Sequence, residues 1–137
     1  MHLHIYDYAY MICAKLEDTM NPQALFKCLA DDTRLKTVLL IAAEQELCVC
    51  ELTTALEVSQ PKVSRHLAQL RDAGLLATRR AGQWIYYSIN PELPDWAKDI
   101  VATTARGNQE VAASSCERLH NMGDRPERNR NYCGASA

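Results

Sequence analysis

The 137-residue chain contains 47 % hydrophobic and 23 % charged residues, with only five Gly and five Pro. This composition is typical of one folded globular domain and excludes a fibrous or largely disordered protein. The formal charge of −2, from 15 Lys and Arg against 17 Asp and Glu, argues against nonspecific nucleic-acid binding by the chain as a whole.

We expect neither a membrane span nor a secretory signal. The longest uninterrupted aliphatic run, Val38 to Ala43, is far shorter than the ~20 residues that cross a bilayer. His2, His4 and Asp7 stand where a signal peptide has Lys or Arg before an apolar stretch. We therefore expect a cytoplasmic protein with no membrane partner. In a reducing compartment its six cysteines are expected to be free thiols or ligands of a soft metal.

The chain divides into three parts. Residues 1–19 mix aromatic and apolar side chains without a clear period, and we treat them as an N-terminal extension. This extension is either an added helix or absent from the native protein, because Met20 is a credible start. Residues 20–119 are expected to form the folded domain, and the polar residues 120–137 a disordered tail.

Four helices are predicted in the first half of the domain, over residues 22–30, 31–45, 51–56 and 60–74. Asp31 or Asp32 is positioned to cap the second helix. Ser59 is positioned to cap the fourth, which tolerates Pro61 in its first turn. A short, partly β-favouring segment, 46–50, separates the second helix from the third.

The pattern changes from helical to alternating after the fourth helix. Residues 75–80 and 83–89 predict two strands of a hairpin that turns at Ala81-Gly82. From 92 to 119 the composition is helical again, with an interruption expected near Gly107. Two helices joined by a tight turn and followed by a hairpin are typical of a winged helix-turn-helix. We therefore expect a mainly α fold with a small β-hairpin.

The fourth predicted helix has the properties of a DNA recognition helix. At 100° per residue, Leu67 and Leu70 fall within about 40° of Val63, so this face is buried. The opposite and flanking arcs offer polar groups to base edges or phosphates, from Gln60, Lys62, Ser64, Arg65, His66 and Gln69. Acidic residues are absent from 60–71, which a merely solvated basic helix does not explain. We therefore expect double-stranded operator DNA as a partner.

The DNA contacts are expected to extend to the hairpin. Arg79 and Arg80 stand there, where they would contact the DNA backbone or minor groove. His66 has a second interpretation, because its place on the flank of the helix also suits a residue that caps the edge of the core.

A Cys-x-Cys pair, Cys48 and Cys50, stands immediately before the helix that precedes the recognition helix. On an ideal helix the two sulfurs would point about 200° apart, so one ion binds both only where the backbone is not helical. Capture of a soft ion would therefore distort the start of this helix and disturb the recognition helix packed against it. We also expect a lowered pKa for thiols at a helix N-terminus. The alternative is a buried structural pair.

A third thiol would complete a three-sulfur site for a soft ion. Cys116, near the end of the last predicted helix, and Cys13 are the candidates that we retain. Cys28 stands beside core positions, and Cys133 falls in the tail.

These motifs resemble those of the ArsR/SmtB family of metal- and metalloid-responsive repressors, most closely its arsenic-responsive members. The matching stretches are 25–27, 29–35, 46–52, 59–67, 82–84 with Tyr87, and 94–97. The resemblance implies a homodimer, paired through its first and last helices, that represses a resistance operon. It also implies release from DNA when As(III) or Sb(III) binds Cys48 and Cys50, with no other cofactor.

The sequence departs from the arsenic-responsive pattern at Thr53, where such repressors often have a third Cys. Binding would then use two thiolates and another ligand, or a distant Cys. The same Cys-x-Cys occurs in the cadmium- and lead-responsive branch, where N-terminal cysteines complete the site. Cys13 therefore keeps a response to Cd(II) or Pb(II) as an alternative.

An enzyme and a redox sensor are the competing functions. The spacing of Cys28 and Arg34 is that of phosphatases and arsenate reductases, but the segment between them has no Gly. Asp31 and Asp32 also stand where an anion would bind. We therefore expect no enzyme activity. A repressor that senses oxidation through the Cys-x-Cys pair is the other alternative.

Overall fold

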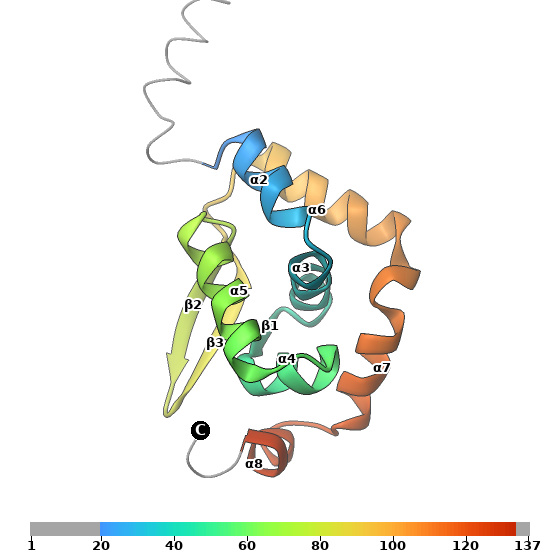
Figure 1. Ribbon diagram of the computed structural model, residues 1–137. Helices are drawn as coiled ribbons and strands as arrows, with labels where there is room; N and C mark the ends of the chain where they lie inside the picture. Colours follow the sequence, from blue (N-terminus) through green and yellow to red (C-terminus); the bar gives the residue numbers. More distant parts are fainter. Residues whose placement is uncertain (1–19, 134–137) are drawn as a thin grey trace, which may run out of the picture.

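The computed structural model describes residues 20–133. The N-terminal extension, Cys13 and the side chain of Cys133 lie outside this part. The elements follow the chain in the order α2 (Pro22–Leu29), α3 (Asp32–Glu44), β1 (Glu46–Cys48), α4 (Val49–Leu56), α5 (Gln60–Asp72), β2 (Leu76–Ala81), β3 (Trp84–Ile89), α6 (Asp95–Gly107), η1 (Gln109–Ala112), α7 (Ala113–Asn121) and α8 (Glu127–Cys133). Figure 1 shows α3 at the centre, with the other elements around it. No helix within residues 20–133 combines the length and apolarity that a bilayer span requires.

The starts of α3 and α5 follow the sequence signals. The Asp31 carboxylate accepts a hydrogen bond from the Arg34 N–H at 3.0 Å, so Asp31, and not Asp32, caps α3. Ser59 occupies the N-cap position of α5, although its side chain makes no capping hydrogen bond. Pro61 lies in the first turn of α5, where the missing N–H removes no helical hydrogen bond.

The predicted hairpin is confirmed and gains a third strand. β2 and β3 pair antiparallel from Leu76 and Ile89 to Ala81 and Trp84, and Gly82 adopts a φ of +63° in the turn. β1 pairs with the other edge of β3, so the strand order is β1-β3-β2. The segment that precedes α4 is therefore attached to the hairpin, or wing, as well as to the helix-turn-helix.

The core joins α3 to the helix-turn-helix. Leu40 of α3, Leu52 of α4 and Leu67 of α5 are completely buried. The buried face of α5 is the one that helical periodicity predicts, because Val63 and Leu70 are also at most 1 % exposed. α4 contacts both α3 and α5. Since protein interiors are close-packed, a displacement at α4 reaches the recognition helix through these contacts.

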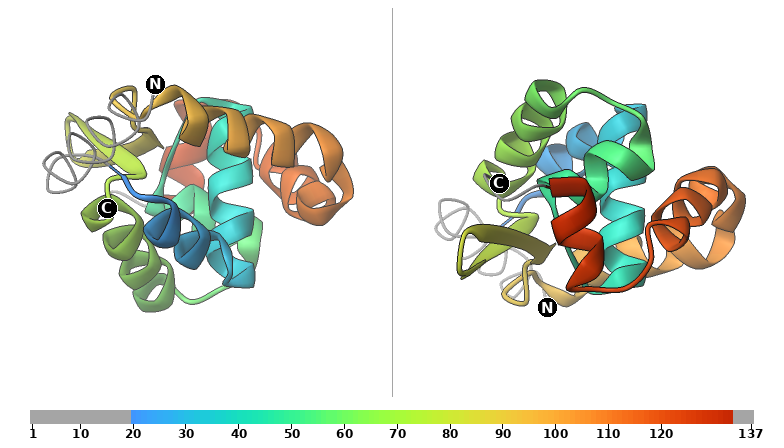
Figure 2. Two further views of the ribbon diagram at one scale, coloured as in Figure 1. Left: turned by 90° about the horizontal axis from the view of Figure 1, so that it is seen from above. Right: turned by 90° about the horizontal axis from the view of Figure 1, so that it is seen from below.

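The C-terminal region differs from the prediction. The interruption near Gly107 is confirmed, because α6 ends there and η1 and α7 follow. The disordered tail expected over 120–137 is wrong for its described part, since residues up to 133 include the end of α7 and all of α8. α8 packs against α4, as Figure 2 shows from below. The reason is electrostatic: Arg125 and Arg128 form ion pairs with Glu51, so polar composition here reflects a specific contact.

Candidate functional site

α5 presents a polar surface opposite its buried face. Five of the six side chains predicted to contact DNA from this helix are exposed, namely Gln60, Lys62, Ser64, Arg65 and Gln69. They offer amide, hydroxyl and cationic groups, which suit base edges and phosphates in a major groove. The structure therefore brings these five residues together on one accessible surface.

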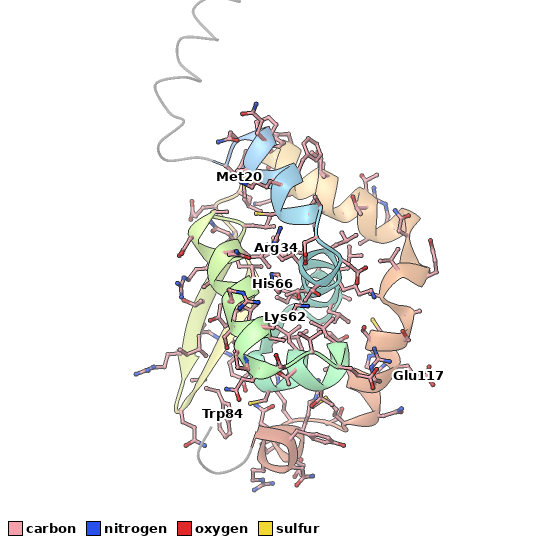
Figure 3. All side chains as sticks on the ribbon, in the orientation of Figure 1. Met20, Arg34, Lys62, His66, Trp84 and Glu117 are labelled. Carbon is pink, nitrogen blue, oxygen red and sulfur yellow. The ribbon has the colours of Figure 1, made fainter. Side chains whose placement is uncertain are left out.

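His66 is the exception among the predicted contacts. Only 7 % of it is exposed, and its Nδ1 lies 3.3 Å from Arg34 Nη1. Its Nε2 lies 3.9 Å from the Asp31 carboxylate. Figure 3 shows His66 and Arg34 between α5 and α3. The second interpretation of His66 fits this geometry, and we assign it to holding α5 in place and not to contacting DNA.

Arg34 contacts the recognition helix, and the sequence analysis gave it no role there. Its guanidinium donates hydrogen bonds to the Cys28 carbonyl at 3.0 Å, the Lys27 carbonyl at 3.2 Å and the Gln69 side chain at 3.0 Å. One side chain therefore ties the end of α2 and the start of α3 to the recognition helix. Its place in the family-like stretch 29–35 was a sequence signal, whereas its spacing from Cys28 pointed to an enzyme instead.

The two wing arginines have different surroundings. Arg79 donates two hydrogen bonds to the Glu46 carboxylate on β1, and its guanidinium lies 5.1 Å from the centroid of the Tyr86 ring. The hydrogen bond from Arg79 lowers the pKa of Glu46. Arg80 is exposed on the adjacent position of β2, whose side chain points to the opposite face. Arg80 is thus the better placed of the two to reach DNA.

The Cys-x-Cys pair spans the boundary between β1 and α4. Cys48 is the N-cap of α4 with extended backbone angles, φ −97° and ψ 172°, while Cys50 lies inside the first helical turn. Glu51 completes a capping box, because its carboxylate accepts a hydrogen bond from the Cys48 N–H at 2.9 Å. The backbone around the pair is therefore partly non-helical, which is the condition that binding of one ion by both sulfurs requires.

The Cys48 thiol does not have the lowered pKa that a helix N-terminus suggests. Burial is the larger cause and the Glu51 carboxylate adds to it, and together they raise the pKa of Cys48 to about 11. The residue is only 2 % exposed. The prediction is wrong for Cys48, because desolvation of the thiolate outweighs the favourable helix dipole.

Cys50 and Cys116 differ from Cys48 in accessibility. Cys50 is half-buried and is disulfide-bonded in this structure, so metal binding through it requires prior reduction.

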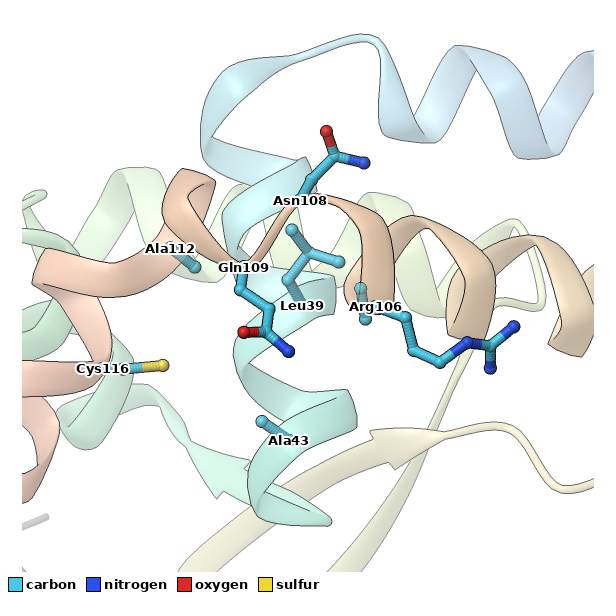
Figure 4. A pocket seen from close by; sticks show the side chains of 8 residues that line it. Leu39, Ala43, Arg106, Asn108, Gln109, Ala112 and Cys116 are labelled. Atoms are coloured by element: carbon cyan, nitrogen blue, oxygen red, sulfur yellow. The ribbon is translucent and has the colours of Figure 1, made fainter.

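Cys116 lies in a cavity of about 340 Å³ between α3, α6 and α7 (Figure 4). Within residues 20–133, no three His, Cys, Asp or Glu side chains are close enough to hold one metal ion. The predicted third ligand Cys116 is therefore not brought to the cysteine pair.

Glu51 is the second residue whose role sequence analysis missed. Its side chain is completely buried one position after Cys50. Arg125 donates two hydrogen bonds to its carboxylate, at 2.7 and 2.9 Å, and Arg128 Nη1 lies 3.1 Å from the same carboxylate. The start of α4 is therefore bound to the C-terminal part of the chain.

Comparison with known proteins agrees with this geometry. The model of the arsR family of bacterial regulatory proteins matches residues 31–78, from the cap of α3 into β2. The chain is 54 % identical over 112 residues to the arsenic resistance transcriptional regulator ArsR1 of Pseudomonas putida, covering 82 % of this chain and 88 % of the relative. The chain belongs to the arsR family.

Two further similarities agree with this assignment. The arsenical resistance operon repressor of Escherichia coli K12 is 54 % identical over 89 residues, which cover 65 % of this chain and 76 % of the relative. The crystal structure of the transcriptional regulator HlyU from Vibrio vulnificus CMCP6 aligns with a TM-score of 0.56 at 29 % identity, covering 77 % of this chain and 97 % of that chain. The predicted winged helix-turn-helix is confirmed.

Members of the arsR family are transcriptional regulators, and the geometry around Cys28 agrees with that class. Cys28 is buried in the last turn of α2, and Arg34 is occupied by the carbonyls of Cys28 and Lys27. Asp31 between them caps α3. This segment is a helix junction and not a loop of amides around an anion.

Proposed function

We propose that this arsR-family chain is a cytoplasmic, homodimeric repressor of an arsenic-resistance operon. It binds operator DNA and leaves it when As(III) or Sb(III) binds the reduced thiols of Cys48 and Cys50. One observation supports this most directly: the Cys-x-Cys pair lies at the capped start of α4, and α4 packs against the recognition helix α5.

Operator binding uses the exposed face of α5 in the major groove, with the wing at its side. Arg65, Gln69 and Gln60 contact base edges or phosphates, while Lys62 and Ser64 contact the backbone. Arg80 extends the contact to the wing, and Arg79 reaches DNA only by leaving Glu46. Because phosphate contacts dominate the affinity, binding falls steeply as salt rises.

Inducer binding acts through the first turn of α4. Both sulfurs reach one As(III) only when the helical turn around Cys50 moves relative to the extended Cys48. This movement breaks the hydrogen bond between the Cys48 N–H and Glu51 and shifts α4 against α5. A 100-fold loss of operator affinity needs about 2.7 kcal/mol of coupling, which two metal–thiolate bonds can supply.

Dimerisation is supported by apolar side chains left on the surface of α2 and α6. Phe26 on α2 is 55 % exposed and Trp96 on α6 is 37 % exposed. Both helices lie at the same end of the molecule in Figure 1. Exposed aromatic residues are enriched where protein surfaces associate. We assign this end of the molecule to the dimer interface.

A thiol-redox repressor is the second candidate, and the disulfide at Cys50 favours it. Release of operator DNA by peroxide, with no release by arsenite, would support this second function. A response to Cd(II) or Pb(II) is the third alternative, with Cys13 as an added ligand; Cys13 lies outside the described residues.

The test is operator binding by the reduced protein, titrated separately with As(III), Sb(III), Cd(II), Pb(II) and Zn(II). Cys48→Ser and Cys50→Ser are expected to bind operator normally and to be insensitive to As(III). Cys116→Ser is the matched control and is expected to respond like the wild type. Normal release of both pair variants by As(III) would remove the proposed site.

A further inference from the structure

Residues 122–133, which we call the C-terminal segment, are fixed to the start of α4 and the sheet. Arg125 Nη2 donates to the Glu46 carbonyl at 2.9 Å in addition to its hydrogen bonds with Glu51. The Arg125 guanidinium also lies 4.3 Å from the centroid of the Tyr86 ring. Asn129 donates a hydrogen bond to the Tyr86 hydroxyl. The segment therefore contacts β1, which contains Cys48, β3, which pairs with it, and the first turn of α4.

The contact is stronger than an ordinary surface ion pair. The Glu51 side chain is completely buried, Arg128 is 9 % exposed, and Arg125 makes a bidentate interaction. Bidentate pairs between Arg and a carboxylate fix geometry, and removing one partner of a buried pair is costly. We call Arg125 and Arg128 on Glu51 the arginine clamp.

The arginine clamp acts on Cys48 through Glu51. The carboxylate that receives the two arginines is the same one that accepts the Cys48 N–H at 2.9 Å. While the arginines hold Glu51, the capping box stays formed and Cys48 remains 2 % exposed. Arg125 therefore influences the exposure of Cys48 through Glu51, without contacting an inducer itself.

We propose that Arg125 is a positioning residue that controls access to the Cys48 thiol, and that the C-terminal segment thereby sets the inducer concentration at which the repressor releases DNA. The second half of this inference rests on the proposed function. Binding of both sulfurs to one ion breaks the capping box, so the clamp stabilises only the uninduced form. An interaction present in one form alone shifts the equilibrium toward that form by its full free energy.

The matched family segment ends before the clamp begins. The arsR-family model covers residues 31–78, whereas the arginines stand at 125 and 128. The two arginines of the clamp thus lie outside the matched DNA-binding segment, whereas Glu51 lies inside it. Inducer sensitivity is expected to change with the C-terminal segment while operator binding does not.

The first experiment measures operator binding of the reduced full-length protein as As(III) is added. Arg125→Met is expected to lower the As(III) concentration for half release by about tenfold, with operator affinity within about twofold of the wild type. Arg125→Lys keeps the charge but loses the bidentate geometry. Its As(III) concentration for half release should lie between those of the wild type and Arg125→Met. Arg130→Met is the matched control, because Arg130 is an exposed arginine of the same C-terminal segment and its ion pair within residues 20–133 is with Glu127.

The inference would be overturned if the As(III) concentration for half release were unchanged in Arg125→Met. An equal decrease of that concentration in Arg130→Met would overturn it as well. A variant that is merely misfolded would lose operator affinity and inducer response together. Should Arg125→Met fail to fold, Arg128→Met replaces it, since this variant removes the second arginine of the clamp and leaves Glu51 with its two hydrogen bonds from Arg125. It should lower the As(III) concentration for half release by a smaller factor, and an unchanged concentration would overturn the inference.

A second measurement needs no arsenic. Iodoacetamide labelling of Cys48, followed by peptide mass spectrometry, should be about tenfold faster in Arg125→Met than in wild type, because the thiol becomes accessible. Equal labelling rates of Cys48 in wild type and Arg125→Met would overturn the inference, regardless of the response to As(III). Wild-type protein that ignores As(III) would overturn the proposed function instead, and the labelling rates would still decide whether Arg125 controls access to Cys48.

Discussion

The two helices of the DNA-binding unit keep their polar groups in opposite places. α5 exposes its amide, hydroxyl and cationic side chains, whereas the start of α4 buries a thiol and a carboxylate. A polar group on a surface acts on a partner at little cost to folding. A buried polar group is coupled to the fold, because it must keep its hydrogen-bond partners. Substitutions on the exposed face of α5 should therefore change DNA affinity without changing the free energy of unfolding. Substitutions at the start of α4 should change the inducer response and the free energy of unfolding together.

The largest effect is expected for Glu51→Ala. The free energy of unfolding should fall by about 3–5 kcal/mol, because a buried ion-pair network loses its shared carboxylate. Arg128 and the Cys48 N–H would be left without that carboxylate. Urea denaturation of the reduced protein measures the change, with the exposed Glu117→Ala as control. A loss no larger than that of the control would show that α4 is not coupled to the fold in this way.

The burial of Cys48 should appear in how the alkylation rate of its thiol depends on pH. Since its pKa is raised from 9.0 to about 11, the thiolate fraction of the folded protein should keep rising up to about pH 11. Alkylation rates of Cys48 measured against pH should follow that curve. The same peptide in urea-unfolded protein is the control and should level off near the ordinary value. A folded-state rate that levels off there as well would contradict the desolvated thiol.

Arg65→Ala tests the α5 half of the comparison. Operator affinity should fall by about tenfold to 100-fold, because an exposed guanidinium that contacts a base or phosphate is lost. Stability and the As(III) response should stay unchanged. Fluorescence anisotropy with labelled operator measures the affinity, and Arg130→Ala supplies the control. Wild-type affinity in Arg65→Ala would remove this residue from the interface.

Arg34→Met tests a residue between these two cases. Arg34 is half-buried, so it contributes to stability, and it donates a hydrogen bond to Gln69 on α5, so it also affects DNA binding. We expect a loss of about 1–2 kcal/mol in stability together with a smaller fall in operator affinity than Arg65→Ala produces. Chemical denaturation and anisotropy on the same sample measure both. Reduced affinity at full stability would mean that Arg34 contacts DNA directly and does not position the helix.

The same contrast explains what the sequence could predict. Val63, Leu67 and Leu70 recur with a helical period, so the buried face of α5 and the winged helix-turn-helix followed from local pattern. His66 stands on the edge of that face, where period alone does not decide between core and surface. Its orientation was settled by Arg34, 32 residues away in the sequence.

The arginine clamp had no local signature at all. Glu51 and Arg125 are separated by 74 residues, and the polar segment that contains Arg125 has the composition of a disordered tail. Likewise, the raised pKa of Cys48 depends on burial, and a position at a helix N-terminus predicts the reverse. Contacts between distant charged residues therefore limit what pattern analysis can establish about the site.

The central claim is that sulfur capture at the start of α4 weakens the hold of α5 on DNA. The most direct measurement is the operator dissociation constant of the reduced wild-type protein, determined once without and once with saturating As(III). The account predicts weakening by about 100-fold, equivalent to roughly 2.7 kcal/mol. Equal dissociation constants for the empty and the arsenic-loaded protein would contradict it.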